Sequence, residues 1–121
     1  MKRLTPPCIA LCALLLPAFA PAQDLVQSAG KHAKVVLDNA DVRVIELNMP
    51  PGASTGMHEH ATDQLVVFLT GGTAKQVGAD GATKELTRKA GDVAWSAPVK
   101  HDTTNESKTP VRTLVIELKK K

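Results

Sequence analysis

The sequence predicts an all-β fold, an antiparallel sandwich or barrel in a single domain, and three observations support this prediction. Short aliphatic and β-branched runs alternate with turn signals at intervals of about 8–12 residues, which is typical of antiparallel sheets. No stretch after residue 22 shows the 3.6-residue periodicity of an amphipathic helix. The chain has 121 residues, which is enough for one domain.

Residues 1–22 resemble a secretory signal peptide rather than part of the fold. Lys2 and Arg3 give a positive start, the segment CIALCALLLPAFA is apolar, and the small residues that follow favour a cut after Ala22. An N-terminal core helix is the alternative, but four prolines disfavour it, and the run is too short for a membrane span. We therefore expect a periplasmic or secreted protein that has no membrane association after cleavage.

The mature domain lacks several chemistries. Both cysteines, Cys8 and Cys12, lie in the removed segment, so the exported domain has no disulfide and no thiolate. Without Lys2 and Arg3 the chain has 13 basic and 12 acidic residues, and it shows no basic stripe. These features exclude a nucleic-acid-binding function.

Turn chemistry separates the expected elements in chain order. A lead-in segment covers 23–33. Strands are expected at 34–38, 42–49, 56–60, 64–70, 73–79, 83–89, 91–97, 99–106 and 111–118. The turns between them include NAD at 39–41, PPGAS at 50–54, the hairpin signal around Asp80-Gly81, and SKTP before the last strand. The barrel domain therefore covers 34–118, and 119–121 form a solvated basic tail.

The strand at 64–70 makes a prediction about assembly. Period-2 alternation places Val66, Phe68 and Thr70 on one face, and Leu65, Val67 and Leu69 on the other. If the first set points inward, the outer face is too apolar for water. The lead-in segment, another strand pair or a second subunit could cover it, and we favour a homodimer.

Histidines supply the candidate metal ligands. His58 and His60 are spaced i, i+2, so on a strand both imidazoles point the same way. Gln64 begins the next strand, and His101 lies on a late strand that a Greek-key connection can bring alongside. Three imidazoles suit a transition metal better than magnesium or calcium.

The stretch Gly52 to Gly71 resembles the first motif of the cupin superfamily. That motif has a glycine, five residues, His-x-His, three or four residues, a glutamate, six residues and a glycine. Every spacing matches, and the one departure is Gln64, where the family usually has glutamate. Around His101 the second motif matches in part. The segment PVKH replaces a longer loop, and Asn105 still follows His101 after three residues.

The resemblance implies a jelly-roll β-barrel with one metal ion inside, held by His58, His60, Gln64 and His101. The metal would be iron, manganese, nickel, copper or zinc. Gln64 is either a direct ligand or a group that hydrogen-bonds a water on the metal. Because an amide adds no negative charge, the ion would keep its full charge and attract anionic substrates or an enolate oxygen.

The leading functional hypothesis is a dioxygenase-like enzyme that acts on a small oxygenated substrate such as an enol, phenol or diketone. The sequence identifies no catalytic acid or base. Two alternatives remain open. One is a non-catalytic periplasmic module that binds a metal or small ligand, and the other is a dimerising scaffold with vestigial histidines.

Overall fold

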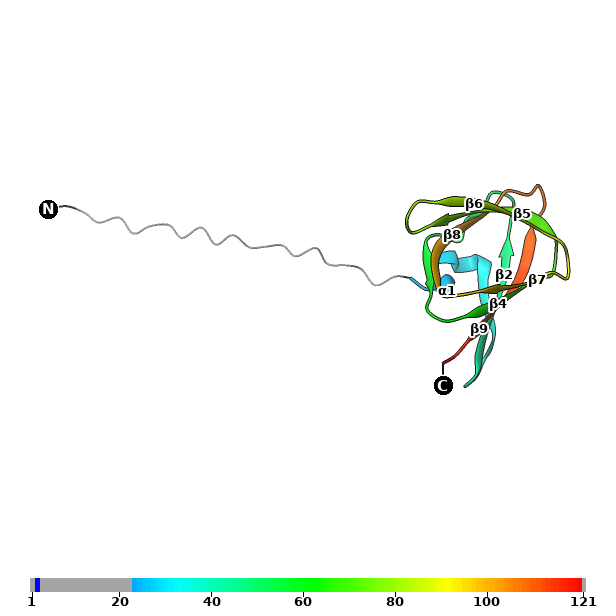
Figure 1. Cartoon of the computed structure of the whole chain (residues 1–121), viewed down its shortest axis with the longest axis horizontal. Coiled ribbons are helices and arrows are strands. Elements are labelled where there is room, and N and C mark those ends of the chain that lie inside the picture. The colour runs from blue at the N-terminus through cyan, green and yellow to red at the C-terminus, as the bar shows by residue number, and fades with distance from the viewer. Residues whose placement is uncertain (1, 3–22, 121) are drawn as a thin grey trace.

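The computed structural model describes Lys2 and residues 23–120 (Figure 1). Apart from Lys2, the predicted signal peptide lies outside the described residues. Within residues 23–120, no helix has the length and apolar character needed to cross a membrane.

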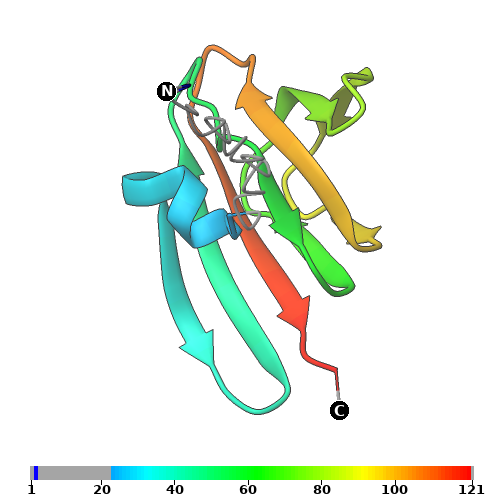
Figure 2. The ribbon, with the colours of Figure 1, turned by 90° about the vertical axis from the view of Figure 1, so that its left-hand side faces the viewer.

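Antiparallel strands make up most of the described chain and form two sheets that face each other (Figure 1, Figure 2). The first sheet has the order β1-β2-β9-β4-β7, and the second has the order β3-β8-β5-β6. Their bounds are β1 Ala33–Asp38, β2 Val42–Met49, β3 His58–His60, β4 Gln64–Phe68, β5 Gly72–Gly78, β6 Thr83–Arg88, β7 Val93–Ser96, β8 Val99–Asn105 and β9 Val111–Leu118. The predicted all-β antiparallel fold is thus confirmed.

The lead-in segment contains a short helix that periodicity did not predict. It folds into α1 (Leu25–Ala29) and a 3₁₀ turn, η1 (Gly30–His32). The Asp24 side chain accepts a hydrogen bond from the Gln27 amide, and the Gln27 side chain accepts one from the Asp24 amide. A five-residue helix is too short to show a period, so this capping box was its only sign in the sequence.

The helix completes the core of the barrel. Leu25 is 2% exposed, and it packs with apolar side chains from the inner face of the first sheet. The buried apolar cluster consists of Leu25, Ala29, Ile45, Leu47, Met49 and Val115. The lead-in segment is therefore part of the folded unit and lies against β1 and β3.

Strand β4 follows the predicted alternation for most of its length. Gln64, Val66 and Phe68 line the cavity between the sheets. The prediction for Thr70 is wrong, because β4 ends at Phe68. The amides of Leu69 and Thr70 both donate to the Arg112 carbonyl, so two residues oppose one and the alternation breaks.

The outer face of this sheet is apolar, as expected. Val93 and Trp95 of β7 are 61% and 60% exposed. In the sheet they lie opposite Val67 and Leu65 of β4. Helix α1 does not cover this face, because its Leu25 lines the cavity on the inner side. The homodimer stays a prediction, which light scattering in solution can test.

Candidate metal centre

Strand pairing brings three histidines together at one end of the barrel. His58 and His60 alternate onto the inner face of β3, and the antiparallel register places His101 of β8 directly opposite His58. The ring centroid of His58 lies 4.7 Å from that of His60 and 4.8 Å from that of His101. One nitrogen from each ring lies within 4.8 Å of the others. The shortened second motif therefore still delivers His101 to the cluster.

A glycine fixes the orientation and the tautomer of His58. Gly56 has a backbone φ of +73°, which residues other than glycine rarely adopt. Its carbonyl oxygen lies 2.8 Å from His58 Nδ1. That nitrogen must therefore carry the proton and donate it to the carbonyl. In a neutral imidazole, Nε2 is then left with a lone pair that points into the cluster.

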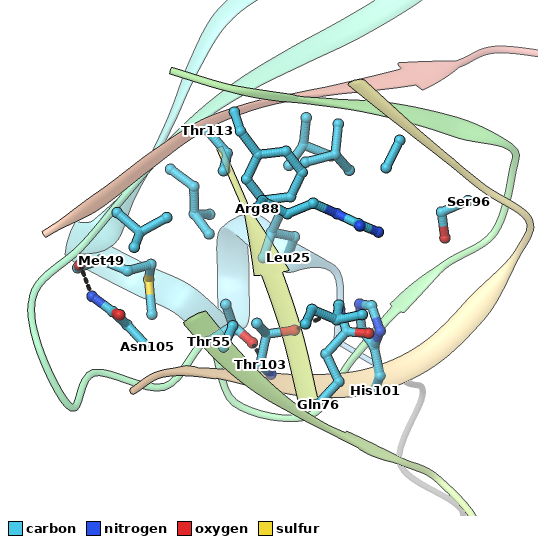
Figure 3. A pocket seen from close by; sticks show the side chains of 18 of the residues that line it. Leu25, Met49, Thr55, Gln76, Arg88, Ser96, His101, Thr103, Asn105 and Thr113 are labelled. Carbon is cyan, nitrogen blue, oxygen red and sulfur yellow. Dashed lines mark hydrogen bonds between the residues drawn. The ribbon is translucent and has the colours of Figure 1, made fainter. Parts of the chain in front are cut away.

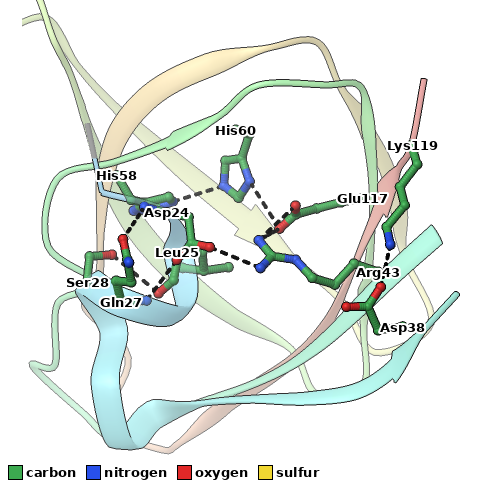
Figure 4. Close-up of polar contacts among 10 residues, drawn as sticks. All are labelled: Asp24, Leu25, Gln27, Ser28, Asp38, Arg43, His58, His60, Glu117 and Lys119. Carbon is green, nitrogen blue, oxygen red and sulfur yellow. Dashed lines mark hydrogen bonds and ion pairs between the residues drawn. The ribbon is translucent and has the colours of Figure 1, made fainter. Parts of the chain in front are cut away.

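Behind His60 lies a chain of charged side chains that the sequence analysis did not assign (Figure 4). His60 Nδ1 is 4.0 Å from the carboxylate of Glu117 on β9. Glu117 accepts two hydrogen bonds of 3.1 Å from Arg43, and Arg43 also donates to Asp24 at 3.0 Å. The network connects the N-cap of α1 to the histidine cluster.

Burial keeps all three imidazoles uncharged at neutral pH. Desolvation lowers the pKa of His58. The pKa of His60 falls to about 3, because desolvation acts together with the neighbouring His58 and His101. Desolvation and His58 lower the pKa of His101 to about 4. Neutral imidazoles are the form that binds metal ions.

The hydrogen-bonding pattern fits a cation between His58 and His60. Their Nε2 atoms are 2.9 Å apart. If His60 donated from Nε2, its Nδ1 lone pair would be buried without a partner and would face the Glu117 carboxylate. If His60 instead carries its proton on Nδ1, two lone pairs meet at 2.9 Å, and a cation resolves the repulsion.

The spacing agrees with this conclusion. Two nitrogens that each lie about 2.0–2.1 Å from one metal ion would be at most about 4.2 Å apart. The 2.9 Å between the two Nε2 atoms is within that limit. A metal-binding imidazole usually donates its other N–H to a carbonyl or a carboxylate. His58 has the Gly56 carbonyl in that role, and His60 has Glu117 nearby.

Gln64 supplies an unused acceptor in the same cavity. Its side chain is 2% exposed, and its Oε1 is buried without a hydrogen-bond partner among the described residues. In the sheet it pairs with Glu117 of β9, so both side chains lie on the inner face. Leaving such an oxygen unpaired costs about 1–3 kcal/mol, which a metal ion or a water held by it would offset.

The histidines open onto a cavity of about 230 Å³ between the two sheets (Figure 3). The residues Val66, Phe68, Leu86 and Val99 form part of its apolar walls.

Asn105, the asparagine of the second motif, has a structural role. Its amide nitrogen donates to the carbonyls of Met49 and Thr109, so it ties the turn after β8 to β2.

The structure brings the three predicted histidines together, and it adds supporting residues that sequence reasoning missed. Glu117 could have been found, because Thr113, Val115 and Glu117 share one face of β9, and Glu117 is the only acidic residue in that set. Gly56 lies two residues before His58, but its carbonyl direction depends on a turn that the sequence does not specify. In the predicted basic tail, Lys119 is exposed and forms an ion pair with Asp38 of β1.

Comparison with known proteins agrees with the fold. A cupin domain from Bordetella pertussis Tohama I has 31% sequence identity and a TM-score of 0.69, and the match covers 73% of this chain and 92% of that one. A cupin 2 conserved barrel protein from Salinispora arenicola has 26% identity and a TM-score of 0.54, covering 69% and 71% of the two chains.

One curated relative matches over a shorter stretch. The Beta-alanine degradation protein BauB of Pseudomonas aeruginosa is 54% identical over 39 residues, which are 32% of this chain and 41% of that protein. This chain thus matches less than half of the relative's length.

The sequence model of the family described as Cupin domain matches residues 45–117, which include the three histidines of the cluster. The chain belongs to the cupin family.

Proposed function

We propose that this protein binds one divalent transition metal ion in its barrel and acts on a small oxygenated substrate, in the manner of a dioxygenase. The observation that carries the proposal is the convergence of three neutral imidazoles on a cavity with room beside them. His58, His60 and His101 would hold the ion, with Gln64 as a further ligand or as a group that orients water. Cupins host many chemistries, so the site and not the fold supports this choice.

The residues around the site define which substrates fit. No aspartate or glutamate is among the described residues that line the cavity, so no carboxylate there can remove a proton. This favours substrates that lose a proton readily, such as enols, phenols and 1,3-diketones. A bound divalent metal supplies Lewis acidity toward the deprotonated oxygen and, where it is redox-active, electron transfer. The apolar walls keep bulk water away from the reacting centre.

A dioxygenase reaction needs no separate reductant. Both oxygen atoms of O₂ enter the substrate, and the electrons that reduce O₂ come from the substrate itself. The chain's own contribution is to bind the substrate, orient it and exclude water.

A non-catalytic role is the second candidate, and the same observation favours it. A cavity without an acidic side chain can hold a metal or a small ligand and carry out no reaction. Metal content by inductively coupled plasma mass spectrometry tests both candidates, with His58→Ala as the control. We expect about one metal ion per chain in the wild type and none in the variant. Equal metal in both proteins would exclude the site.

Oxygen consumption then separates the two candidates. The metal-loaded protein is mixed with acetylacetone, catechol and 3-oxobutanoate in an oxygen electrode. Uptake that His58→Ala abolishes supports the enzyme. Full metal loading without uptake on the whole substrate panel supports the binding module.

Export is part of the proposal, supported by the signal-peptide pattern. Among the described residues, Gln23 and Asp24 already contact the domain. The Glu59 amide donates to the Gln23 carbonyl at 2.8 Å, and Asp24 caps α1. Cleavage after Ala22 would leave these contacts intact. N-terminal sequencing of the exported protein should begin at Gln23, and an intact Met1 in the purified protein would contradict export.

A further inference from the structure

The cavity has a positive side that the histidine site does not use. Strand β6 places Lys84, Leu86 and Arg88 on the same face, and all three line the cavity. None of the described residues that line this cavity is acidic. Lys84 is exposed and also borders a second pocket with Asp80, so Arg88 is the cation that belongs to this cavity alone. A cavity with this charge pattern favours an anionic ligand over a neutral or a cationic one.

Arg88 is the better placed of the two cations. Its side chain extends into the cavity, with the guanidinium end on the side where Ser96 lies (Figure 3). The guanidinium carbon lies 5.9 Å from the centre of the Phe68 ring. Its Nε is buried, and no described residue accepts a hydrogen bond from it.

The other two described arginines, unlike Arg88, form ion pairs with acidic side chains. Arg43 is paired with Glu117 and Asp24, and Arg112 is paired with Glu46. The Arg88 side chain forms no ion pair and no hydrogen bond within residues 23–120. The Phe68 ring lies within cation–π distance of the guanidinium but satisfies none of its five N–H donors.

We propose that Arg88 binds the carboxylate of a small oxo- or hydroxy-acid, whose oxygenated end faces the histidine cluster. A planar guanidinium matches a carboxylate with two parallel hydrogen bonds, and burial strengthens such a pair. The identity of the reacting end rests on the proposed function, whereas the carboxylate end rests on Arg88 and the cavity charge alone.

The cavity volume limits the size of this acid. About 230 Å³ is smaller than the roughly 300–1,000 Å³ of pockets that hold drug-sized ligands. A short-chain aliphatic acid fits this space, whereas a polycyclic flavonol does not. The inference therefore narrows the substrate class to small keto- or hydroxy-carboxylates.

Isothermal titration calorimetry tests the proposal with 4-oxopentanoate, 3-oxobutanoate and glutarate as acids, and with methyl 4-oxopentanoate as the uncharged probe. Each is titrated into the metal-free protein and the zinc-loaded protein. We expect at least one acid to bind the wild type, and the ester of 4-oxopentanoate to bind at least about tenfold more weakly than the acid. Arg88→Gln should weaken acid binding by at least about tenfold.

Two variants complete the design. Arg88→Lys keeps the charge but loses the planar fork, so it should retain part of the affinity, which a mere folding defect in Arg88→Gln would not explain. Arg112→Gln removes the same group from the outer face and should bind the acids as the wild type does. Circular dichroism confirms that each variant is folded.

The outcomes distinguish this inference from the proposed function. Acid binding that depends on Arg88 in a protein that takes up no metal would support the inference and contradict the metal site. Full metal loading with equal acid binding by wild type and Arg88→Gln would overturn the inference alone. Failure of every acid to bind at about 10 mM would also overturn it, since specific sites bind more tightly than that.

Discussion

Two groups of side chains face the same cavity and are held in opposite ways. Each of His58 and His60 has a protein group behind it, namely the Gly56 carbonyl and the Glu117 carboxylate. The Arg88 guanidinium lies near the Phe68 ring, and its side chain has no hydrogen-bonding partner among the described residues. The histidine cluster is therefore built before a ligand arrives, and the arginine is left with open donors.

This difference matches the demands of two kinds of ligand. A metal ion has short, directional bonds, so its donors must be fixed by a surrounding layer of hydrogen bonds. An exchanging organic anion needs a donor that water or ligand can occupy in turn. The comparison predicts that changes behind the histidines alter metal affinity, whereas changes at Arg88 alter ligand affinity and leave metal content unchanged.

Removal of a metal-binding histidine should have the largest effect. We expect His101→Ala to weaken zinc binding by more than about 100-fold, beyond what the loss of a supporting group costs. His32→Ala is the matched control, because His32 lies in η1 and outside the cluster. Competitive chelation with a fluorescent indicator measures both affinities. Zinc binding by His101→Ala at wild-type strength would remove His101 from the site.

Loss of the carboxylate behind His60 should have the next largest effect. Glu117→Gln takes away the negative charge that favours a proton on His60 Nδ1, and it weakens the pairing with Arg43. We expect zinc affinity to fall by about 10–100-fold. Glu46→Gln breaks a half-exposed pair with Arg112 on the same sheet and should leave zinc affinity unchanged. If both variants bound zinc equally well, the histidine cluster would not depend on its supporting network.

A carboxylate in place of Gln64 should strengthen the metal end and weaken the anion end. Gln64→Glu adds a negative charge to a buried position in the cavity, so we expect zinc to bind about tenfold more tightly. The same charge should repel 4-oxopentanoate and reduce its affinity. Chelation and calorimetry on one preparation measure both effects. Unchanged zinc affinity would mean that Gln64 does not contact the metal.

Acidification should have a moderate effect on the metal-free protein. The unfolded histidines have pKa values near 6.5, whereas the folded His60 and His101 have pKa values of about 3 and 4. The unfolded state therefore binds more protons between these values, and the free energy of unfolding decreases as the pH falls below about 6.5. Urea midpoints at pH 7 and pH 5 measure this decrease. His101→Ala should reduce it, and an equal decrease in that variant would contradict the assignment.

The sequence predicts much of the fold because the relevant signals are local. Turn chemistry and period-2 alternation place β2 and β9 with the expected bounds, and the i, i+2 spacing places His58 and His60 on one face. His101 was harder, since its position opposite His58 depends on pairing between distant strands. The family motif supplied that link, and the register of β3 with β8 confirms it.

The supporting groups could not be predicted because they depend on long-range pairing. Glu117 lies on β9 of the first sheet and His60 on β3 of the second, so their approach depends on how the two sheets face each other. Arg88 lines the cavity because β6 joins the second sheet as its edge strand. The capping box at Asp24 was visible in the sequence. Its ion pair with Arg43 was not, because 19 positions separate the two residues.

The position of Asp24 has a practical consequence for anyone who prepares this protein. A truncated version that starts at the first strand, Ala33, would look complete by its sheets but would lose the cap of α1 and one partner of Arg43. The same truncation would remove Gln23, whose carbonyl accepts a hydrogen bond from the Glu59 amide. A version that begins at Gln23 keeps all of these contacts.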